Sequence, residues 1–286
     1  MNITIIIVTF KSEKIIYKCL SSINKKYPVL IIENSKNKKF KSLIEKKFLN
    51  VKCILTGKNL GFGKANNIGL RLAKTNYVLL LNPDTVLSTN TLQVLSNSAH
   101  RIKDFALLAP IIVNSNKLNY GFFDNSKIIN IKKSNDAFEV DYIKGFAMFF
   151  NKKKFSKIGF FDENIFLYLE EIDLCNRLNS INEKIYLIPE AKIKHLGGRS
   201  HGKEFNIEIE ISRNWHWMWS NFYYKKKHFG KIRAYNETIS LFFKSILKTI
   251  FFLFFSKKKF LINKARFLGL FNSYLGKDSF YRPFNE

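Results

Sequence analysis

The sequence is poor in cysteine, with only Cys19, Cys53 and Cys175 among 286 residues. Their number is odd and their spacing matches no metal-ligand pattern, which argues against a disulfide framework and against a zinc finger. We therefore expect free thiols in a reducing compartment. A signal peptide is not expected, because residues 3–10 read as a strand, without a basic segment or a small-residue cleavage site.

Acidic residues are also scarce. There are 22 Asp and Glu residues against 48 Lys and Arg residues, which gives a formal net charge of +26. Nucleic acid is the first partner to consider for such a charge. The lysines, however, are spread along the whole chain, and zinc-finger spacing, an RNP1-type strand and a basic region with heptads are all missing. We expect no nucleic-acid binding and favour an anionic membrane surface or anionic substrates.

The first 81 residues alternate between two apolar patterns. Short, nearly continuous apolar runs, typical of buried strands, occupy residues 3–10, 29–33, 51–55 and 77–81. Helical spacing occurs between them, after a predicted Ser12 cap, at about 39–48 and at 64–74. Four strands that alternate with three helices predict an α/β fold with a doubly wound, mostly parallel sheet.

Beyond residue 84 the pattern is looser. We expect a helix near 89–101, a strand at 105–113 and a mobile polar loop at 114–136. A strand at 141–150 should carry Gly145 where a bulky side chain would block a cleft. A helix is predicted at 166–179, and a strand at 184–188 that Pro189 closes. From about residue 204 the chain reads as helical, which predicts a first domain of residues 1–203 and a helical extension of residues 204–286.

The strand at 77–81 runs directly into Asn82-Pro83-Asp84. Pro83 cannot donate a hydrogen bond to a neighbouring strand, so the strand ends there. Open α/β sheets bind their ligands beyond the carboxyl ends of their strands. Asp84, beside Asn82, is therefore placed to carry a divalent metal on a nucleotide diphosphate. A simple Pro-Asp turn is the alternative.

The loop from Asn59 to Gly69 contains glycines at the start of a predicted helix. It is not a Walker A loop, because Lys58 stands at the first glycine position and no Ser or Thr follows Lys64. It is not a Rossmann fingerprint, because Asn66 stands at the third glycine position. It can still bring the backbone close to a nucleotide, and an ordinary turn and cap is the alternative.

Two further segments carry titratable side chains. Glu170, Glu171 and Asp173 lie at a predicted helix start, which suits the helix dipole. The flanking Phe, Tyr and Leu residues would raise the pKa of such a carboxylate toward the range of a general base. His195 follows a strand around 192–194 and precedes paired glycines that allow close approach of a ligand. A purely structural histidine is the alternative.

Together and in this order, these segments resemble the inverting glycosyltransferases of family 2, which have the GT-A fold. Within that family they resemble the rhamnosyltransferase-like enzymes of cell-surface polysaccharide assembly. The resemblance covers about residues 3–200. It rests on the 5–10 strand with Thr9, Glu33-Asn34-Ser35, Asn59 to Gly69, Asn82-Pro83-Asp84, Gly145, Phe161-Asp162-Glu163, Glu170 to Cys175 and His195 to Ser200.

The resemblance implies roles for individual residues. Asp84 corresponds to the metal-binding carboxylate of a DXD-type motif, and His195 to a histidine that can join the same Mn²⁺ or Mg²⁺. Glu171 corresponds to the catalytic base. The nucleotide-sugar-binding candidates are Thr9, Glu33, Asn59, Gly61, Asn66 and Asn82. The candidates that line the acceptor site are Gly145, Asp162, Glu170 and Asp173. The family usually has Asp at positions 33 and 171, so each carboxylate here lies one methylene further out.

The resemblance implies metal-dependent, inverting transfer of a sugar from a dTDP- or UDP-sugar to a hydroxyl of an acceptor saccharide, which is expected to be lipid-linked. The reaction is expected in O-antigen, capsule or cell-wall glycan assembly. The alternative is a non-catalytic basic protein that binds membrane or nucleic acid on a nucleotide-binding scaffold. The joint presence of Asp84, Glu171 and His195 argues against it. A nucleotidyltransferase is disfavoured, because no glycine-rich loop with a following basic residue opens the first strand.

The last third of the chain mixes aromatic and basic residues. Residues 213–229 combine Trp, Phe and Tyr with three lysines, as at a membrane interface. The apolar run within residues 239–255 falls short of the roughly 20 residues that span a bilayer. A narrow polar stripe is predicted there, formed by Lys244, Lys248, Ser240, Ser245 and Thr249. With residues 257–259, all lysines, these features predict a helix lying on the cytoplasmic leaflet. Packing on the first domain or in a homodimer is the alternative.

Overall fold

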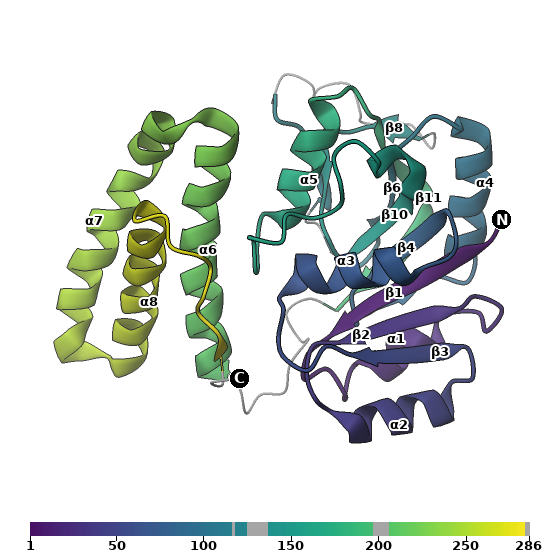
Figure 1. The fold of residues 1–286 in the computed structure, drawn as a ribbon, viewed down its shortest axis with the longest axis horizontal. Coiled ribbons are helices and arrows are strands. Elements are labelled where there is room, and N and C mark those ends of the chain that lie inside the picture. The colour runs from purple at the N-terminus through teal and green to yellow at the C-terminus, as the bar shows by residue number, and fades with distance from the viewer. Residues whose placement is uncertain (116–117, 125–136, 197–205, 284–286) are drawn as a thin grey trace. The chain divides into compact units, whose positions relative to one another are not determined.

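The computed structural model describes residues 1–115, 118–124, 137–196 and 206–283, and it separates into two compact units (Figure 1). The sheet unit contains Met1–Phe161 and Glu171–Gly202, and the helical unit contains Asp162–Glu170 and Lys203–Glu286. The predicted division at residue 203 therefore differs in one segment. Asp162–Glu170, which lies inside the predicted first domain, belongs to the helical unit.

The sheet unit begins with alternating strands and helices: β1 (Ile3–Thr9), α1 (Ile16–Ser21), β2 (Val29–Glu33), α2 (Lys38–Lys47), β3 (Val51–Leu55), α3 (Phe62–Leu72) and β4 (Tyr77–Leu81). β1 pairs in parallel with β2 and β4, and β2 pairs in parallel with β3. The predicted parallel arrangement is therefore confirmed. Because the strands run the same way, their carboxyl ends meet at one edge of the sheet, where Thr9 lies beside Glu33.

The remaining elements of this unit are β5 (Thr85–Leu87), α4 (Thr91–Ile102), β6 (Leu107–Ile112), β7 (Tyr120–Gly121), β8 (Phe138–Glu139), β9 (Tyr142–Ile143), β10 (Ala147–Asn151), η2 (Lys152–Phe155), α5 (Glu170–Asn179) and β11 (Ile185–His195). Among the described residues the main sheet has the order β3-β2-β1-β4-β10-β6-β11-β5, with β8 beside β11. β10 runs antiparallel to β4 and β6, so the second half of the sheet is mixed. β7 and β9 form a separate pair.

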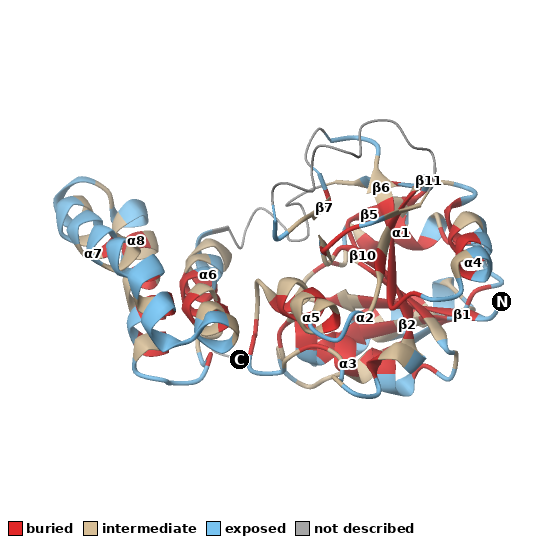
Figure 2. Ribbon diagram, turned by 90° about the horizontal axis from the view of Figure 1, so that it is seen from above, coloured by how far each residue is buried: buried red, intermediate tan, exposed pale blue. Residues whose placement is uncertain are grey.

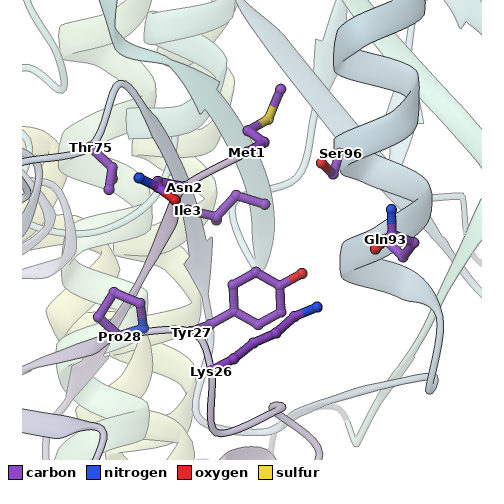
Figure 3. Close-up of a pocket in the computed structure, with 9 residues that line it drawn as sticks. All are labelled: Met1, Asn2, Ile3, Lys26, Tyr27, Pro28, Thr75, Gln93 and Ser96. Atoms are coloured by element: carbon purple, nitrogen blue, oxygen red, sulfur yellow. The ribbon is translucent and has the colours of Figure 1, made fainter.

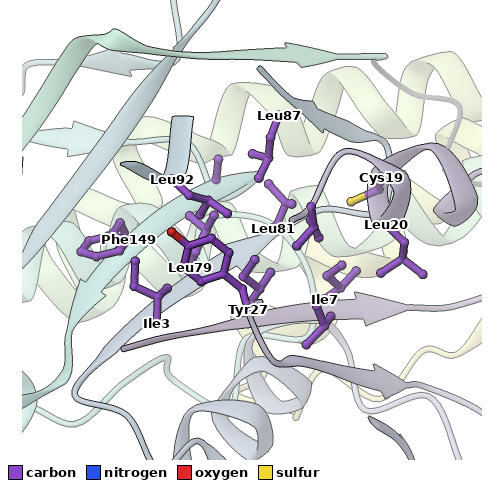
Figure 4. Packing of buried hydrophobic residues seen from close by; sticks show 14 of the residues in the cluster. Ile3, Ile7, Cys19, Leu20, Tyr27, Leu79, Leu81, Leu87, Leu92 and Phe149 are labelled. Carbon is purple, nitrogen blue, oxygen red and sulfur yellow. The ribbon is translucent and has the colours of Figure 1, made fainter. Parts of the chain in front are cut away.

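Helices cover both faces of the sheet (Figure 1). Ile3, Ile5 and Ile7 of β1 point to one face, where they pack with residues of α1, α2 and α4. Figure 4 shows part of this cluster. Ile6 points to the other face, where residues of α3 and α5 lie. Burial on both faces explains why the central strands are almost continuously apolar.

Four predicted elements differ from the structure, and the first three lie outside the segment before α5. α1 begins at Ile16 and has no side-chain cap, because the Ser12 hydroxyl bonds to the backbone of Phe10 instead. The strand predicted at 141–150 is divided into β9 and β10, with Gly145 in the turn between them. The strand predicted to end at Pro189 continues to His195, because a register shift after Ile188 accommodates the proline.

The helix predicted from residue 166 begins at Glu170. Tyr168 and Leu169 directly before it have φ angles of 72° and 69°, which are incompatible with a right-handed helix. Of the predicted loop at 114–136, residues 116–117 and 125–136 lie outside the described residues, and so do residues 197–200 of the His195 to Ser200 motif.

The helical unit contains α6 (Asn206–Phe229), α7 (Lys231–Phe255) and α8 (Lys257–Tyr274), which confirms the predicted helical extension. Met218, Phe222 and Leu270 are part of its core. α6 and α8 approach very closely, since a Cβ atom added at Gly269 would lie 2.2 Å from the Trp215 carbonyl oxygen. A side chain at position 269 would separate the two helices.

α7 buries small polar residues and exposes large apolar ones. Figure 2 shows much of this helix in the colour of exposed residues. Thr238 and Ser245 are buried, whereas the side chains of Phe243, Leu247 and Phe254 are 58%, 68% and 78% exposed. The predicted polar stripe is therefore wrong for Ser245, which faces the bundle. Among the described residues, α7 is the one helix that is long and apolar enough to cross a membrane, by length and composition, whereas the sequence predicted an apolar run too short to span a bilayer.

Candidate active site

Strand pairing brings Asp84 and His195 together, although they are far apart in the sequence. β5 pairs antiparallel with β11, so that Thr85 lies opposite His195. The Nε2 atom of His195 lies 3.4 Å from Oδ1 of the buried Asp84 carboxylate. The Leu196 amide also donates a 2.9 Å hydrogen bond to the Asp84 carbonyl. The two residues predicted to hold a metal therefore face each other at the end of β11.

Two residues that the sequence did not single out hold His195 in place. The Phe146 ring stacks on the imidazole with 4.4 Å between centroids and 18° between planes. The Asn114 side chain accepts a hydrogen bond from the His195 amide and donates one to its carbonyl, both at 3.0 Å. Asn114 directly follows the strand predicted at 105–113. Its place at a strand end could have indicated that it lies near the site.

Hydrogen bonds to neighbouring segments hold the Asn82–Asp84 turn in place. The Asn82 amide donates to the Phe146 carbonyl at 2.9 Å, and the Asn82 carbonyl accepts from Thr85 at 3.1 Å. The buried Cys19 thiol lies 3.7 Å from the same carbonyl as a weak donor. Burial, together with the nearby Asp84 charge, raises the pKa of the Cys19 thiol. Cys19 therefore remains a neutral, packing thiol.

Asp84 and His195 fit a divalent cation. A carboxylate oxygen with a single imidazole suits Mn²⁺ or Mg²⁺, and Mg²⁺ commonly takes one or two carboxylates together with substrate phosphates. Two atoms that each lie about 2.1 Å from one ion are at most about 4.2 Å apart, and the observed separation is 3.4 Å. Within the described part of the chain, no group of three or more His, Cys, Asp or Glu side chains could hold a metal. The remaining ligands would come from the diphosphate and water.

The carboxyl ends of β1 and β2 carry the first pair of nucleotide candidates. Thr9 Oγ1 donates a 2.5 Å hydrogen bond to Oε2 of Glu33, and Ser35 Oγ donates one of 2.5 Å to Oε1. Thr9 and Glu33 are both buried. Two hydroxyl groups therefore fix the longer side chain that Glu33 has in comparison with the usual aspartate.

The loop before α3 contains the next candidates. The Asn34 side chain donates to the Gly61 carbonyl at 3.0 Å and accepts from the Leu60 amide at 3.3 Å. Asn59 Oδ1 accepts from the Gly61 amide at 3.1 Å, and Asn66 donates to the Phe62 carbonyl at 3.0 Å. Gly61 has a φ of 83°, which favours glycine. These amides shape the loop, and Asn34 belongs with them although it was not among the candidates.

Glu171 lies in the first turn of α5 beside Gly145. A Cβ atom added at Gly145 would lie 3.6 Å from the Glu171 Cβ and 3.4 Å from the Phe62 ring. Those are ordinary contacts, so a methyl group fits, whereas a larger side chain would press on both residues. Burial raises the pKa of the Glu171 carboxyl group, although backbone N–H groups including those of Gly145 and Ile172 partly offset the rise. The environment therefore favours a carboxylate that can accept a proton.

The other carboxylates of this cluster are more buried than Glu171. Asp173 is fully buried and pairs with Arg177 Nε at 2.8 Å. Arg177 also donates to the carbonyls of Ile158 and Phe160. Asp173 therefore helps to fix α5 to the preceding loop. Glu170 is buried as well, whereas Glu171 keeps partial exposure. Access by an acceptor favours Glu171 among the three.

The backbone before this helix is strained. Tyr168 and Leu169 occupy the left-handed region in succession. Each non-glycine residue held there costs about 1–3 kcal/mol and requires support from its surroundings.

Asp162, the remaining acceptor-site candidate, begins the same segment of the helical unit, and its Oδ2 accepts hydrogen bonds from Tyr223 and Lys227. These contacts give Asp162 a structural position.

A hollow of about 440 Å³ lies elsewhere in the sheet unit, and Figure 3 shows the side chains that line it. It is lined by residues at the beginnings of strands, including Met1, Ile3, Tyr27 and Thr75. The beginnings of parallel strands lie at the sheet edge opposite to their carboxyl ends. This hollow is therefore separate from the edge that carries Thr9, Glu33 and Asp84.

Relatives of known name match the chain over most of its length. The sequence model described as "Glycosyl transferase family 2" matches residues 4–160. Rhamnosyltransferase WbbL of Escherichia coli is 23% identical over 265 residues, covering 83% of this chain and 98% of the relative. The low-salt glycan biosynthesis hexosyltransferase Agl10 of Haloferax volcanii is 25% identical over 198 residues. That match covers 64% of each protein, so the chain spans less than two thirds of the archaeal relative.

Solved structures support the fold. The structure of S. aureus TarS 1–349 matches with a TM-score of 0.55 and 14% identity, covering 99% of this chain and 93% of that chain. GalNAc-T7 with UDP, GalNAc and Mn²⁺ matches with a TM-score of 0.57 and 12% identity, covering 84% and 57%. At these identities the likeness concerns the fold alone, and it confirms the predicted GT-A architecture with its C-terminal helices.

The family model covers more than half of the 286 residues. Rhamnosyltransferases among the relatives confirm the predicted resemblance, including the N-acetylglucosaminyl-diphospho-decaprenol L-rhamnosyltransferase of Mycobacterium tuberculosis, 22% identical over 62% of this chain and 68% of the relative. The chain belongs to glycosyl transferase family 2.

Proposed function

We propose that this chain is a metal-dependent, inverting glycosyltransferase of cell-surface polysaccharide assembly. It would transfer a sugar, with rhamnose as the first candidate, from a dTDP- or UDP-sugar to a hydroxyl of a lipid-linked saccharide. One observation carries the proposal. Asp84 and His195, 3.4 Å apart, fit a divalent metal, and they lie in the same unit as Glu171. Glu171 is partly exposed, and the burial of its carboxyl group raises its pKa.

Glu171 would act as the base. It would take the proton of the acceptor hydroxyl while that oxygen attacks the anomeric carbon from the side opposite to the nucleoside diphosphate. The bond to the diphosphate breaks as the new glycosidic bond forms, so the anomeric configuration inverts. A glutamate with a raised pKa suits this task, because a base works best when its pKa is near the working pH.

Asp84 and His195 would hold a divalent cation on the diphosphate. When bound, the ion supplies a positive charge that stabilises the departing diphosphate. Thr9, Glu33 and the loop shaped by Asn34 would receive the nucleoside, because they lie at or beside the carboxyl ends of neighbouring parallel strands.

The donor class is supported by the relatives. The dTDP-rhamnosyl transferase RfbF of Shigella flexneri is 24% identical over 200 residues, 64% of this chain. TarS has been solved in complex with UDP. These names leave dTDP and UDP as the two nucleotides to compare, and both bases present the same imide edge to hydrogen-bonding groups.

A membrane surface is proposed as the partner of α7. Its outer face exposes Phe251, Leu253, Phe254 and Phe255 by 55–78%, and the exposed Lys257 to Lys259 follow directly. Apolar side chains beside lysines match the chemistry of an anionic leaflet. A peripheral position on the cytoplasmic face would bring the enzyme to a lipid-linked acceptor. A homodimer through α7 is the competing outcome, and sedimentation of the protein without lipid would detect it.

The test is donor turnover in the presence of Mn²⁺ or Mg²⁺. The full chain is incubated with UDP-, dTDP- and GDP-sugars and a lipid-linked saccharide, and the product is examined by NMR at the anomeric centre. We expect transfer from one donor, with inversion and with loss of activity in EDTA. Retained configuration would contradict the role of Glu171. Nucleotide binding without turnover of any donor would favour the non-catalytic alternative.

A further inference from the structure

The chain directly before Glu171 takes a path that its own residue types do not favour. Tyr168 and Leu169 both lie in the left-handed region, with φ angles of 72° and 69°. Residues other than glycine adopt these angles in succession only when their surroundings hold them. α5 begins at the next residue, Glu170. The direction in which α5 starts therefore depends on what holds this turn.

α6 supplies contacts at the turn itself. Ser220 Oγ donates a 2.8 Å hydrogen bond to the Leu167 carbonyl. Arg213 Nε donates a 2.6 Å hydrogen bond to the Tyr168 hydroxyl. The Trp217 ring meets the Tyr168 ring edge to face, with 5.6 Å between centroids. Three side chains of one helix thus hold Leu167, which precedes the left-handed pair, and Tyr168, its first member.

The same helix holds the rest of the segment. His216 stacks on Phe166 with 4.4 Å between ring centroids. Tyr223 and Lys227 donate to Asp162 at 3.0 and 2.7 Å. Burial opposes the charge on Asp162, but these hydrogen bonds outweigh it and lower the pKa of Asp162. The contacting positions, 213, 216, 217, 220, 223 and 227, are mostly three or four apart and lie on one side of α6.

We propose that α6 is the scaffold of the turn at residues 168–169, and that Arg213 and Ser220 are positioning residues for Glu171. The inference rests on the proposed function in one respect, namely that Glu171 is the base. α6 holds the turn, the turn sets the first residues of α5, and Glu171 is the second residue of that helix. The helical unit would therefore support catalysis through the path of the chain, apart from any role of α7.

Hydrogen–deuterium exchange tests the first step without requiring activity. Ser220→Ala removes the hydroxyl that binds Leu167, so the amides of residues 168–172 should exchange about tenfold faster. Ser273→Ala is the matched control, because it removes another buried hydroxyl-to-carbonyl bond of the helical unit, the 3.0 Å bond to Trp219. Exchange at 168–172 that is equal in wild type and Ser220→Ala would overturn the proposal.

Turnover tests the second step. Ser220→Ala should lower kcat about tenfold through misplacement of the base, with nucleoside diphosphate binding in Mn²⁺ unchanged and a Tm equal to that of Ser273→Ala. Adding Leu169→Gly should restore most of the lost kcat, because glycine adopts a left-handed φ without support. Leu169→Asn provides a second version of this rescue. Wild-type kcat in Ser220→Ala, or no recovery with either residue at 169, contradicts the proposal.

Glu171→Gln in the same assays separates this inference from the proposed function. If that variant stays active, Glu171 is not the base and the proposed function fails, while the exchange rates still decide whether α6 holds the turn. If Glu171→Gln is inactive but Ser220→Ala behaves as wild type in both assays, Glu171 remains the base and α6 does not position it.

Discussion

The central strands of the sheet unit and α7 of the helical unit differ in the kind of side chain that they bury. In the sheet unit, Ile5, Leu79 and Phe149 have no exposed surface, as in a protein surrounded by water. In the helical unit, Thr238 and Ser245 of α7 are buried, while Phe254 and Phe255 are 78% and 71% exposed. Small residues between helices and large apolar residues outside are typical of helices in contact with lipid. This difference is the one expected if α7 lies on the membrane surface proposed above.

The largest expected effect belongs to the sheet unit. Glu171→Gln keeps the size of the side chain but cannot accept a proton, so turnover should fall by about 10²–10⁴-fold. Nucleoside diphosphate binding and liposome binding should both stay at wild-type values, because neither requires the base. If the variant keeps more than a third of wild-type turnover, Glu171 is not the base and Glu170 becomes the candidate.

Matched phenylalanine truncations examine the comparison directly. Phe149→Ala leaves a cavity in the sheet unit and should lower the free energy of unfolding by about 3–5 kcal/mol. Phe254→Ala alters an exposed side chain and should change it by less than about 0.5 kcal/mol in water. Denaturant unfolding of both variants provides the measurement. A large loss in Phe254→Ala would mean that α7 packs against protein, as in a dimer.

Charge removal tests the membrane side of the comparison. Replacing Lys257, Lys258 and Lys259 by Gln should weaken binding to anionic liposomes at low salt by about 10²-fold, from about 1 kcal/mol for each lysine. Turnover of a water-soluble acceptor should not change. The control replaces three exposed lysines of α2, namely Lys38, Lys39 and Lys46. Equal losses in the two triple variants would show a general charge effect without a defined surface on the helical unit.

Asp84→Asn tests the metal site. The carboxylate should act through the ion, so nucleoside diphosphate affinity should fall by about 10–100-fold in Mn²⁺ and should not change in EDTA. Calorimetric titration with UDP and dTDP under both conditions gives the two affinities. A loss of the same size in EDTA would assign Asp84 a structural role in the turn.

The smallest effect concerns His216 of the helical unit. Its ring lies between Ser279 and the Tyr281 carbonyl, and burial lowers the pKa of His216 to about 3 from 6.5. The unfolded chain therefore binds more protons than the folded chain between these pH values. Stability should consequently fall as the pH drops from about 6.5, by up to about 1.4 kcal/mol per pH unit.

His216→Gln should flatten that slope in urea unfolding between pH 7 and pH 5. If His216→Gln has the wild-type slope, other groups cause the acid sensitivity of the helical unit.

Much of the sheet unit could be predicted because its signals are local. The runs that became β2, β3 and β4 have the predicted bounds, since each is a short apolar segment between polar turns. Asp84 could be located for the same reason, because Pro83 marks the strand end. The partners of His195 could not be predicted, because Phe146 and Asn114 reach it only through strand pairing across the sheet.

The start of α5 and the orientation of α7 also lacked local signals. Tyr168 and Leu169 carry no glycine or asparagine that would announce a left-handed turn, and their support comes from α6, far along the sequence. In α7, Lys244 and Ser245 are neighbours in the sequence, yet one is exposed and the other buried. Residue type suggested one polar stripe, whereas packing on small residues determined which side faces the bundle.

The placement of Asp162–Glu170 in the helical unit has a consequence for protein engineering. A hybrid of two family members could be built by joining the N-terminal part of one to the C-terminal part of the other. A hybrid joined near residue 203 would leave this short segment from one parent against α6 from the other. Contacts such as Ser220 with Leu167 would then have mismatched partners. A working hybrid of this protein should carry both pieces from the same parent.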